Sequence, residues 1–397
     1  MTIPAMNPND FDRFLAKTTP QPLGLEIVKA SGSYLWDASG KKYLDFVAGV
    51  SACSLGHCHP KVVQAIQRQA ADYLHVMVYG EFAQKPVTDL AKKLLGLMPE
   101  THEKIYLTNS GTEAIEGALK LAKRATGRSG IVAAHHSYHG STQGALSVTG
   151  YEPIKQAYRP LLPDVSFIPF NSPEALETIN TSTAAVILET IQGGAGFIVP
   201  QKDYLQQVKA RCKVVGALLI LDEIQPGFGR TGRLFGFEHF GVVPDIVVMG
   251  KGMGGGLPIG AFTASSALMD LLAVNPSLGH ITTFGGHPLI AAAALATLEE
   301  ISDTNLLQQI PEKEALIREM LQHPKIKKIN GQGLMLAPIL ETPAEVDQVV
   351  LGALEEGLIL FWLLWEKRVL RISPPLNISK EEIREGCQII LRLLDRL

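Results

Sequence analysis

The chain has 397 residues, of which 46% are hydrophobic and 19% are charged, and its formal net charge is −3. This composition is typical of a globular protein and excludes a disordered one, and the length predicts two domains. The small negative charge gives no reason to expect binding to nucleic acid or to an anionic membrane surface. Four cysteines are too few for a disulfide framework, the first ten residues lack a signal-peptide pattern, and the most apolar window, 358–365, is too short to span a membrane. We therefore expect a cytoplasmic protein.

Short apolar runs alternate with amphipathic stretches through the middle of the chain. Before them, residues 32–40 and 42–46 have the pattern of a β-hairpin. The alternation predicts an α/β fold, in which helices cover both faces of a mainly parallel sheet. The expected strands are 104–108, 130–134, 165–169, 184–188, 217–221 and 246–249, and the clearest helices among them are 113–123 and 204–211.

The last third of the chain has the pattern of an α+β region. Ser379 and Glu382 have the spacing of a capping box at the start of its last helix. We expect a large domain at residues 46–285 and a smaller domain formed by residues 1–45 together with 286–397. The elements expected in this third are helices at 291–301, 311–322 and 380–394 and short strands at 333–336 and 369–373.

Two apolar runs end on charged residues. The run 214–221 is followed by Asp222, and the run 245–250 is followed by Lys251. Glycines dominate residues 252–256, where backbone or ligand can approach the lysine closely. Because open α/β sheets bind ligands at the carboxyl ends of their strands, we expect this amine and this carboxylate to face one site.

Residues 108–114 lie between an expected strand and a strongly helical run. The first N–H groups of that helix, with the hydroxyl groups of Ser110 and Thr112, are suited to hold a phosphate group. Serine and threonine are also common as ordinary helix N-caps, so this segment alone does not decide between the two interpretations. An amine, a carboxylate and a phosphate cradle together are what pyridoxal phosphate (PLP) requires.

Other motifs suggest other ligands but lack the necessary context. Residues 227–232 and 250–255 both match G-x-G-x-x-G, but neither is expected to open a helix, so we expect no nicotinamide or flavin site. Two histidine-containing segments, 57–59 and 135–139, raise the question of a metal ion. Adjacent side chains on a turn point in different directions and no second cluster has zinc spacing, so we expect no metal site.

Six segments carry a resemblance to a known family, and they occur in the family's order. The sequence Asp-Glu-x-Gln-x-Gly-x-Gly-Arg-Thr-Gly from Asp222, followed by Gly-Lys-Gly around Lys251, is highly specific. On these residues the chain resembles the class III (ω-amino-acid) aminotransferases, which are PLP enzymes of fold type I, along nearly its whole length. The segments are 56–60, 109–114, 221–232, the surroundings of Lys251, 282–286 and 370–375.

The resemblance implies a role for each matching residue. Lys251 would form the Schiff base with the PLP aldehyde and, once displaced by the incoming amine, would carry a proton between the substrate carbon and the cofactor. Asp222 would keep the pyridine nitrogen protonated, and Arg371 would bind a substrate carboxylate with a bidentate fork. The other cofactor contacts would come from Ser110, Gly111 and Thr112 at the phosphate, Tyr138 and His139 at the ring, and Gln225 at the phenolic oxygen.

The resemblance also implies an assembly and a reaction. In this family, Thr283 reaches the phosphate of the neighbouring subunit's cofactor, so we expect a homodimer with a shared active site. The reaction would be ping-pong: a donor amine passes its amino group to the cofactor, which then aminates 2-oxoglutarate or pyruvate.

The chain departs from the family where the donor is recognised. Ornithine, acetylornithine and 4-aminobutyrate enzymes usually have glutamate at the position of Gly194 and arginine at that of Ser141, and ornithine enzymes have tyrosine at that of Val50. Without the glutamate, Arg371 should stay free to hold a carboxylate in both half-reactions. Glu189 matches the family, and we expect it to be structural or to support the site. These departures favour an ω-amino acid or amine as donor, without a requirement for two carboxylates.

Three alternatives stay open. The length and segment order also resemble the acetylornithine branch of the family. A PLP decarboxylase or aminomutase of the same fold would use the same residues and would differ in its product. A non-catalytic cofactor-binding protein would be expected to have lost Lys251 or Asp222, and both are present.

Overall fold

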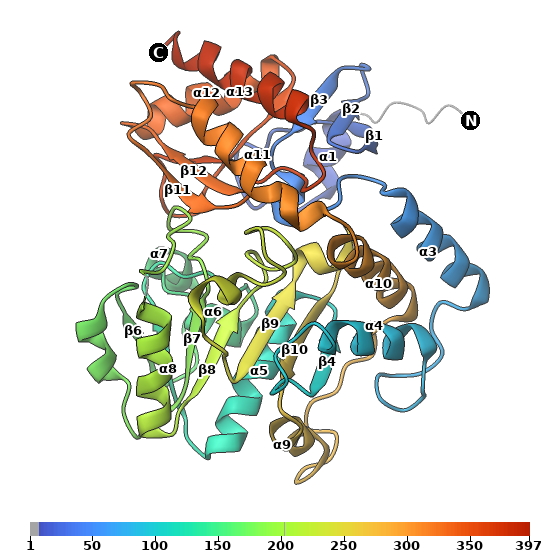
Figure 1. The fold of residues 1–397 in the computed structure, drawn as a ribbon, viewed down its shortest axis with the longest axis vertical. Coiled ribbons are helices and arrows are strands. Elements are labelled where there is room, and N and C mark those ends of the chain that lie inside the picture. Colours follow the sequence, from blue (N-terminus) through green and yellow to red (C-terminus); the bar gives the residue numbers. More distant parts are fainter. Residues whose placement is uncertain (1–7, 202) are drawn as a thin grey trace.

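The computed structural model describes residues 8–201 and 203–397. Within these residues, seven strands form a central sheet in the order β4-β10-β9-β8-β7-β5-β6 (Figure 1). Neighbouring strands are parallel except in the two pairs that involve β10. The chain thus has the α/β fold that the sequence predicts. The strands are β4 (Lys104–Thr108), β5 (Gly130–Ala134), β6 (Val165–Ile168), β7 (Thr183–Glu189), β8 (Leu218–Asp222), β9 (Ile246–Gly250) and β10 (Gly260–Ala264).

Strand β10 is the one member of this sheet that the sequence pattern did not predict. It is short, and it follows directly on the glycine-rich stretch after Lys251, so its local sequence gives no clear strand signal. The strand lies antiparallel between β9 and β4. It therefore brings the segment that follows β4 close to the end of β9.

Helices cover both faces of this sheet, which explains why its central strands are mainly apolar. All residues of β7 are buried. Leu188 packs into the core on one face together with residues of α8 (Tyr204–Val215). Ile187 points to the opposite face and packs with residues of α5 (Gly111–Thr126).

A second, smaller sheet joins the two ends of the chain. β1, β2 and β3 are antiparallel neighbours, as the predicted hairpin requires, and β13 pairs in parallel with β3, so that Leu358 lies opposite Leu44. Residues 27–45 and most of residues 306–397 consequently lie together in the upper part of Figure 1. The strands are β1 (Ile27–Ser31), β2 (Tyr34–Asp37), β3 (Lys42–Asp45) and β13 (Leu358–Ile359).

The helices predicted in the last third are present, with two differences. α11 begins at Leu306 and contains Pro311 in its interior, whereas the sequence placed proline at its start. α12 was not predicted. The capping box of the last helix is confirmed, since Ser379 Oγ accepts a hydrogen bond from Glu382 N. The elements are α10 (Pro288–Ser302), α11 (Leu306–Met320), α12 (Pro343–Glu355), α13 (Lys380–Leu394), β11 (Lys328–Gln332) and β12 (Met335–Ile339).

Helix α10 packs against α3 (Pro60–Asp72) and α4 (Lys85–Leu95), which precede the large sheet in sequence. The domain boundaries at residues 46 and 285 stay a prediction. The remaining elements are α1 (Pro8–Phe14), α2 (Ala48–Ser51), α6 (Gln143–Val148), α7 (Glu152–Lys155), α9 (Ser266–Met269), β14 (Phe361–Trp362), β15 (Leu370–Arg371) and the 3-10 turns Gln156–Tyr158, Pro173–Thr178, Gly236–Phe240, Lys251–Gly254 and Asp270–Ala273.

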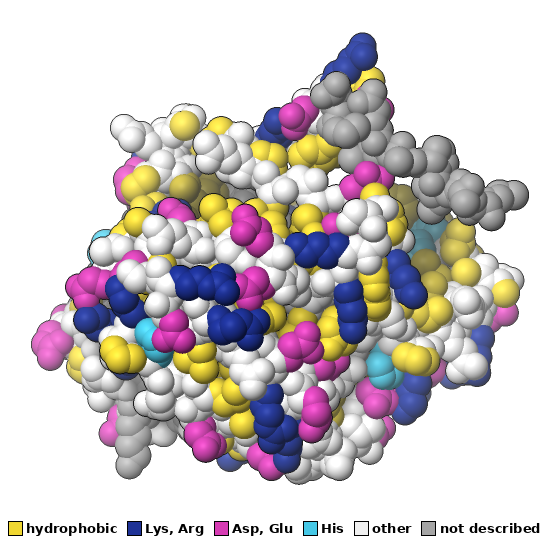
Figure 2. All heavy atoms as spheres, turned by 90° about the horizontal axis from the view of Figure 1, so that it is seen from above, with side chains coloured by type: hydrophobic (Ala, Val, Ile, Leu, Met, Phe, Trp, Pro, Cys, Tyr) yellow, Lys and Arg dark blue, Asp and Glu magenta, His cyan; other side chains and the backbone are white. Residues whose placement is uncertain are grey.

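The surface carries both signs of charge. On the face shown in Figure 2, lysine and arginine side chains are interspersed with aspartate and glutamate. In the described part of the chain, no helix combines the length and the apolar character that crossing a membrane requires.

Candidate active site

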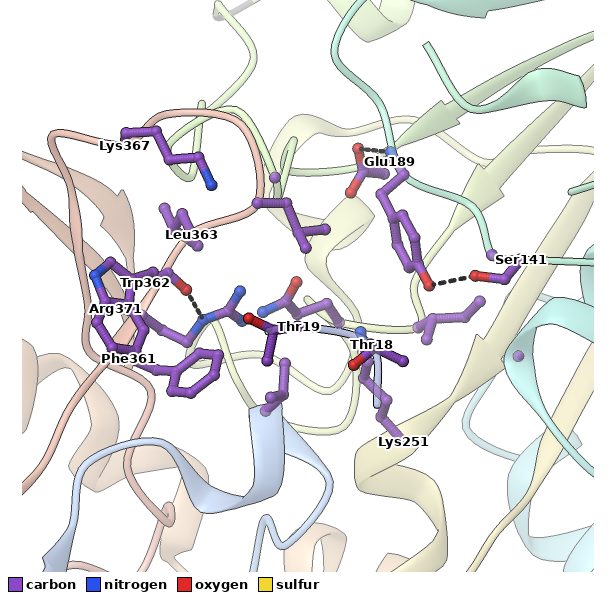
Figure 3. A pocket seen from close by; sticks show the side chains of 18 of the residues that line it. Thr18, Thr19, Ser141, Glu189, Lys251, Phe361, Trp362, Leu363, Lys367 and Arg371 are labelled. Carbon is purple, nitrogen blue, oxygen red and sulfur yellow. Dashed lines mark hydrogen bonds between the residues drawn. The ribbon is translucent and has the colours of Figure 1, made fainter. Parts of the chain in front are cut away.

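The carboxyl ends of the parallel strands open onto a cavity of about 1470 Å³. Its wall includes Glu189 at the end of β7, Asp222 at the end of β8 and Lys251 directly after β9. This edge is where open α/β sheets bind ligands. The structure therefore brings together the amine and the carboxylate that the sequence singled out, and Figure 3 shows Lys251 in this wall.

Lys251 has a backbone conformation that lysine rarely adopts. Its φ is 44°, in the left-handed region where a residue with a Cβ is strained. It begins a 3-10 turn that ends β9 abruptly at the cavity. Burial lowers the pKa of its amine, and the like charge of Arg371 lowers it further, while Asp222 and Glu189 act in the opposite direction. A lysine whose pKa is lowered in this way is suited to act as a nucleophile and as a base.

Two glycines let the start of α5 lie against β9 and β10. A Cβ on Gly250 would come 3.3 Å from the Cα atom of Gly111, and a Cβ on Gly260 would come 2.0 Å from the carbonyl oxygen of Ser110. The close backbone approach therefore requires glycine at position 260 and favours it at position 250. As a result, Gly111 and Thr112, the first residues of α5, line the cavity. The N–H groups at a helix start and the positive end of its dipole are suited to a phosphate group.

The hydroxyl groups of this segment already have partners. Ser110 is the N-cap of α5, and its Oγ accepts a hydrogen bond from Glu113 N at 3.4 Å. Thr112 Oγ1 lies 2.8 Å from Thr142 Oγ1. The ordinary N-cap interpretation of Ser110 is thus confirmed, whereas its contact with a phosphate stays a prediction.

Asp222 is held by two hydrogen bonds. Its Oδ2 lies 2.8 Å from His139 Nδ1, and its Oδ1 accepts a hydrogen bond from Ile224 N at 2.9 Å. His139 is buried, and within the described residues its Nε2 has no hydrogen-bond partner. This arrangement fits a His139 that donates from Nδ1 and so orients the carboxylate of Asp222 at the cavity.

Tyr138 and Gln225 line the cavity from two further loops. The N–H group of Tyr138 donates to Glu189 Oε2 at 3.2 Å, and its hydroxyl oxygen lies 3.3 Å from Ser141 Oγ. Gln225 Nε2 is buried and has no hydrogen-bond partner in the described chain. A buried donor without an acceptor is costly, so this amide indicates where a polar ligand atom would bind.

Arg371 presents a buried cation to the same cavity. The residue is only 4% exposed, its guanidinium carbon lies 5.8 Å from the centre of the Phe197 ring, and its Nε donates to the carbonyl oxygen of Trp362 at 3.3 Å. Its Nη1 is buried and has no partner among the residues that the structure describes. Burial lowers the pKa of Arg371 to about 10. A ligand carboxylate would satisfy this charge and its free N–H group together.

Thr283 is exposed and lies outside the wall of this cavity. Its predicted contact with the cofactor of a neighbouring subunit stays a prediction. The three positions at which the chain departs from the family pattern, Val50, Ser141 and Gly194, all line the cavity.

Three parts of the wall were not predicted. Residues 18–23 of the N-terminal segment cross the cavity, and Figure 3 shows Thr18 and Thr19 among them. One side of α12 contributes Asp347, Leu351 and Leu354. The segment 361–367 is the third part, and the apolar window at 358–365 was its only sequence signal. It contributes Phe361, Trp362, Leu363, Leu364 and Lys367.

Comparison with known proteins identifies the family. The family model described as "Aminotransferase class-III" matches residues 15–394. The chain belongs to the class III aminotransferases.

Similar proteins cover almost the whole of this aminotransferase. An acetylornithine aminotransferase of Caldanaerobacter subterraneus subsp. tengcongensis is 39% identical over 385 residues, which are 94% of this chain and 95% of that protein. The structure of an ornithine aminotransferase from Toxoplasma gondii has a TM-score of 0.91 at 32% identity and covers 98% of this chain and 94% of its own. A thermostable omega transaminase mutant from Pseudomonas jessenii has a TM-score of 0.89 at 25% identity and covers 98% of this chain and 97% of its own.

Class III aminotransferases use PLP, and the Toxoplasma enzyme showed partial occupancy of PLP at its active site. The cavity fits this cofactor. It combines the amine of Lys251, the oriented carboxylate of Asp222, the start of α5 and the unpaired amide of Gln225. The chain is therefore a PLP-dependent aminotransferase.

The buried carboxyl of Glu189 predicts a pH-dependent stability. Burial raises its pKa to about 7 from the ordinary 4.5. A carboxyl with a raised pKa stabilises the fold fully below pH 4.5, and this contribution is lost as the pH rises towards 7. Glu189→Gln should remove that loss, so calorimetry should show the variant gaining, relative to the parent, on the order of a few kcal/mol between pH 4.5 and 7.5. Glu177→Gln on the surface controls for the loss of one charge, and a constant difference across this pH range would contradict the assignment.

Proposed function

We propose that this aminotransferase moves the amino group of an ω-amino acid or amine to 2-oxoglutarate or pyruvate in two half-reactions at one site. The observation that supports this most directly is the pairing in one cavity of Lys251, whose pKa is lowered, with Arg371, a buried cation that has no carboxylate partner within the described chain. PLP, when bound, supplies an aldehyde that takes up the amino group and a ring that accepts electron density.

In this proposal, each residue near the ring has one task. Lys251 would attach the cofactor at rest and, once displaced, its neutral amine would carry a proton from the substrate carbon to the cofactor. Asp222, oriented by His139, holds the proton on the ring nitrogen. Tyr138 would cover a face of the ring, and Gln225 Nε2 would donate to the phenolic oxygen, which would give that buried amide its missing acceptor.

Arg371 would bind the carboxylate of the keto acid. Where the amino donor also has a carboxylate, Arg371 would bind it in the other half-reaction. Position 194 is glycine, so no side chain there competes for the guanidinium group. Ser141 places a hydroxyl group in the wall where many relatives have a cation. These features support a donor that needs a single carboxylate or none.

A second candidate donor is N-acetylornithine. Acetylornithine aminotransferases are among the relatives of this chain, at 37–42% identity over most of its length. This candidate requires another group to take the place of the arginine that is absent at Ser141.

A homodimer is also part of the proposal. Large apolar side chains are exposed on two segments, 74–82 and 278–284, which are joined by a ring contact of 5.1 Å between His75 and Phe284. Apolar clusters of this kind commonly mark protein interfaces. Thr283 lies on the second segment, where pairing with another copy would carry it towards that copy's cavity. The exposed residues are Leu74, Val76, Met77, Phe82, Leu278, Ile281 and Phe284.

We place the reaction in the cytoplasm. All four cysteines are free, which is consistent with a reducing compartment.

Lys251→Ala tests the central assignment. The variant should lose the absorption band of the lysine-bound cofactor and at least about a thousandfold in turnover, because nucleophile and proton carrier are both removed. Lys61→Ala, an exposed lysine on α3, is the matched control. An unchanged band that borohydride still reduces in Lys251→Ala would refute the role of this residue.

The donor is decided by following the spectral change of the cofactor during the first half-reaction alone. 4-Aminobutyrate or simple ω-amines should convert the cofactor to its amino form at least as fast as N-acetylornithine does. Rapid conversion by N-acetylornithine, with none by the simple donors, would favour the second candidate instead.

Ile281→Glu tests the dimer. A charge in the buried contact should dissociate the enzyme and, if Thr283 completes the partner's site, reduce turnover about tenfold or more. Sedimentation and turnover are measured together, with Val214→Glu, an exposed apolar residue on α8, as the control. A monomeric Ile281→Glu with full activity would contradict the shared site.

A further inference from the structure

Trp365 lies in the segment that follows β14. It contacts two residues of the chain region that contains the large sheet. Its indole stacks on the ring of Tyr151, with 4.2 Å between centroids and 16° between planes. Its backbone N–H donates to the carbonyl oxygen of Gly194 at 3.0 Å. One residue is therefore held both through its ring and through its backbone.

The indole occupies the space that a side chain at position 194 would need. A Cβ on Gly194 would come 2.6 Å from Trp365 Nε1 and 2.9 Å from its Cδ1. The indole is a rigid group whose position is fixed by Tyr151, so the contact cannot be relieved by a small rotation. Trp365 Nε1 is itself buried, and it has no hydrogen-bond partner in the described chain.

Trp365 lies behind the cavity wall rather than in it. Gly194 lines the cavity, as do Leu363, Leu364 and Lys367 from the same segment as Trp365. Figure 3 shows Leu363 and Lys367 at one side of the cavity, with Arg371 below them. Tyr138, which also lines the cavity, has its ring centroid 6.4 Å from that of the indole. The position of the indole thus fixes the position of this part of the cavity wall, formed by Gly194 and residues 363–367.

We propose that Trp365 determines donor specificity, by pressing residues 363–367 onto Gly194 and keeping the wall beside Tyr138 closed. The inference rests on the proposed aminotransferase reaction and deepens it. The donors favoured are straight-chain amines whose amine-bearing carbon has no bulky substituent directed at this wall. Aryl-substituted amines are disfavoured, because the indole occupies the space into which the wall would have to move to accommodate them.

The test compares kcat/KM for 1-phenylethylamine with that for the better of two straight-chain donors, 4-aminobutyrate and N-acetylornithine. In Trp365→Ala this ratio should rise about tenfold or more, the scale on which one group is discriminated in an apolar pocket. The rise should come mainly from KM. The rate of the keto-acid half-reaction should change by less than about twofold, because no group that touches the cofactor is altered.

Gly194→Ala provides an independent route to the same change, since its Cβ should displace the indole. The ratio in the double variant should equal that in either single variant, because the two changes act through one contact. Trp365→Phe keeps a ring on Tyr151 and should retain most of the parent's preference. Trp36→Ala, on β2, controls for the loss of a tryptophan elsewhere.

A cofactor-loaded Trp365→Ala with the parent's ratio would overturn the inference, and so would independent, multiplicative effects of the two substitutions. If Trp365→Ala does not fold, Gly194→Ala decides the matter alone, and an unchanged ratio there rejects the proposal. An active Lys251→Ala would instead reject the proposed reaction, so the two failures are distinguishable.

Discussion

The partial burial of one amine, that of Lys251, is the constraint on which this site depends. Lys251 lies partly buried at the end of β9, where the strand stops and the backbone turns into a left-handed conformation. That turn is compatible with the rest of the fold because Gly250 and Gly260 let the start of α5 approach the sheet. A lysine, a helix start and a strand end are thereby brought together by backbone packing.

Arg371 adds a second cation to the cavity that Lys251, Asp222 and Glu189 line. Arg371 is buried without a carboxylate partner in the described chain, and an uncompensated buried charge is costly. Burial raises the pKa of Glu189 to about 7, so this carboxyl carries only part of a negative charge at neutral pH. An anionic substrate would supply the negative charge that the cavity lacks. This deficit gives a physical reason for the cavity to bind carboxylates and phosphates rather than neutral molecules.

The sequence predicts the parts of the site that depend on local pattern. Six strands of the sheet are apolar runs bounded by turn residues, and Asp222 and Lys251 stand at the ends of two of them, so their meeting follows from parallel topology. Strand β10 escapes prediction because its five residues give no clear local signal and acquire strand character only between β9 and β4. Residues 18–23 and one side of α12 enter the cavity through contacts distant in sequence, which no local period encodes. The hydrogen bond from Glu113 N to Ser110 Oγ confirms that Ser110 is a helix N-cap. It does not decide whether the same residue also contacts a phosphate.

Strand β3 finds its parallel partner β13 only near the end of the chain. On the ribosome, at about 5–20 residues per second, roughly 15 to 60 seconds separate the synthesis of these two strands. During that interval one edge of the nascent β3 has unpaired backbone N–H and C=O groups, which can form hydrogen bonds with strands of other chains. The smaller sheet must therefore be among the last parts to mature, and a chain released before residue 358 would keep that edge open permanently.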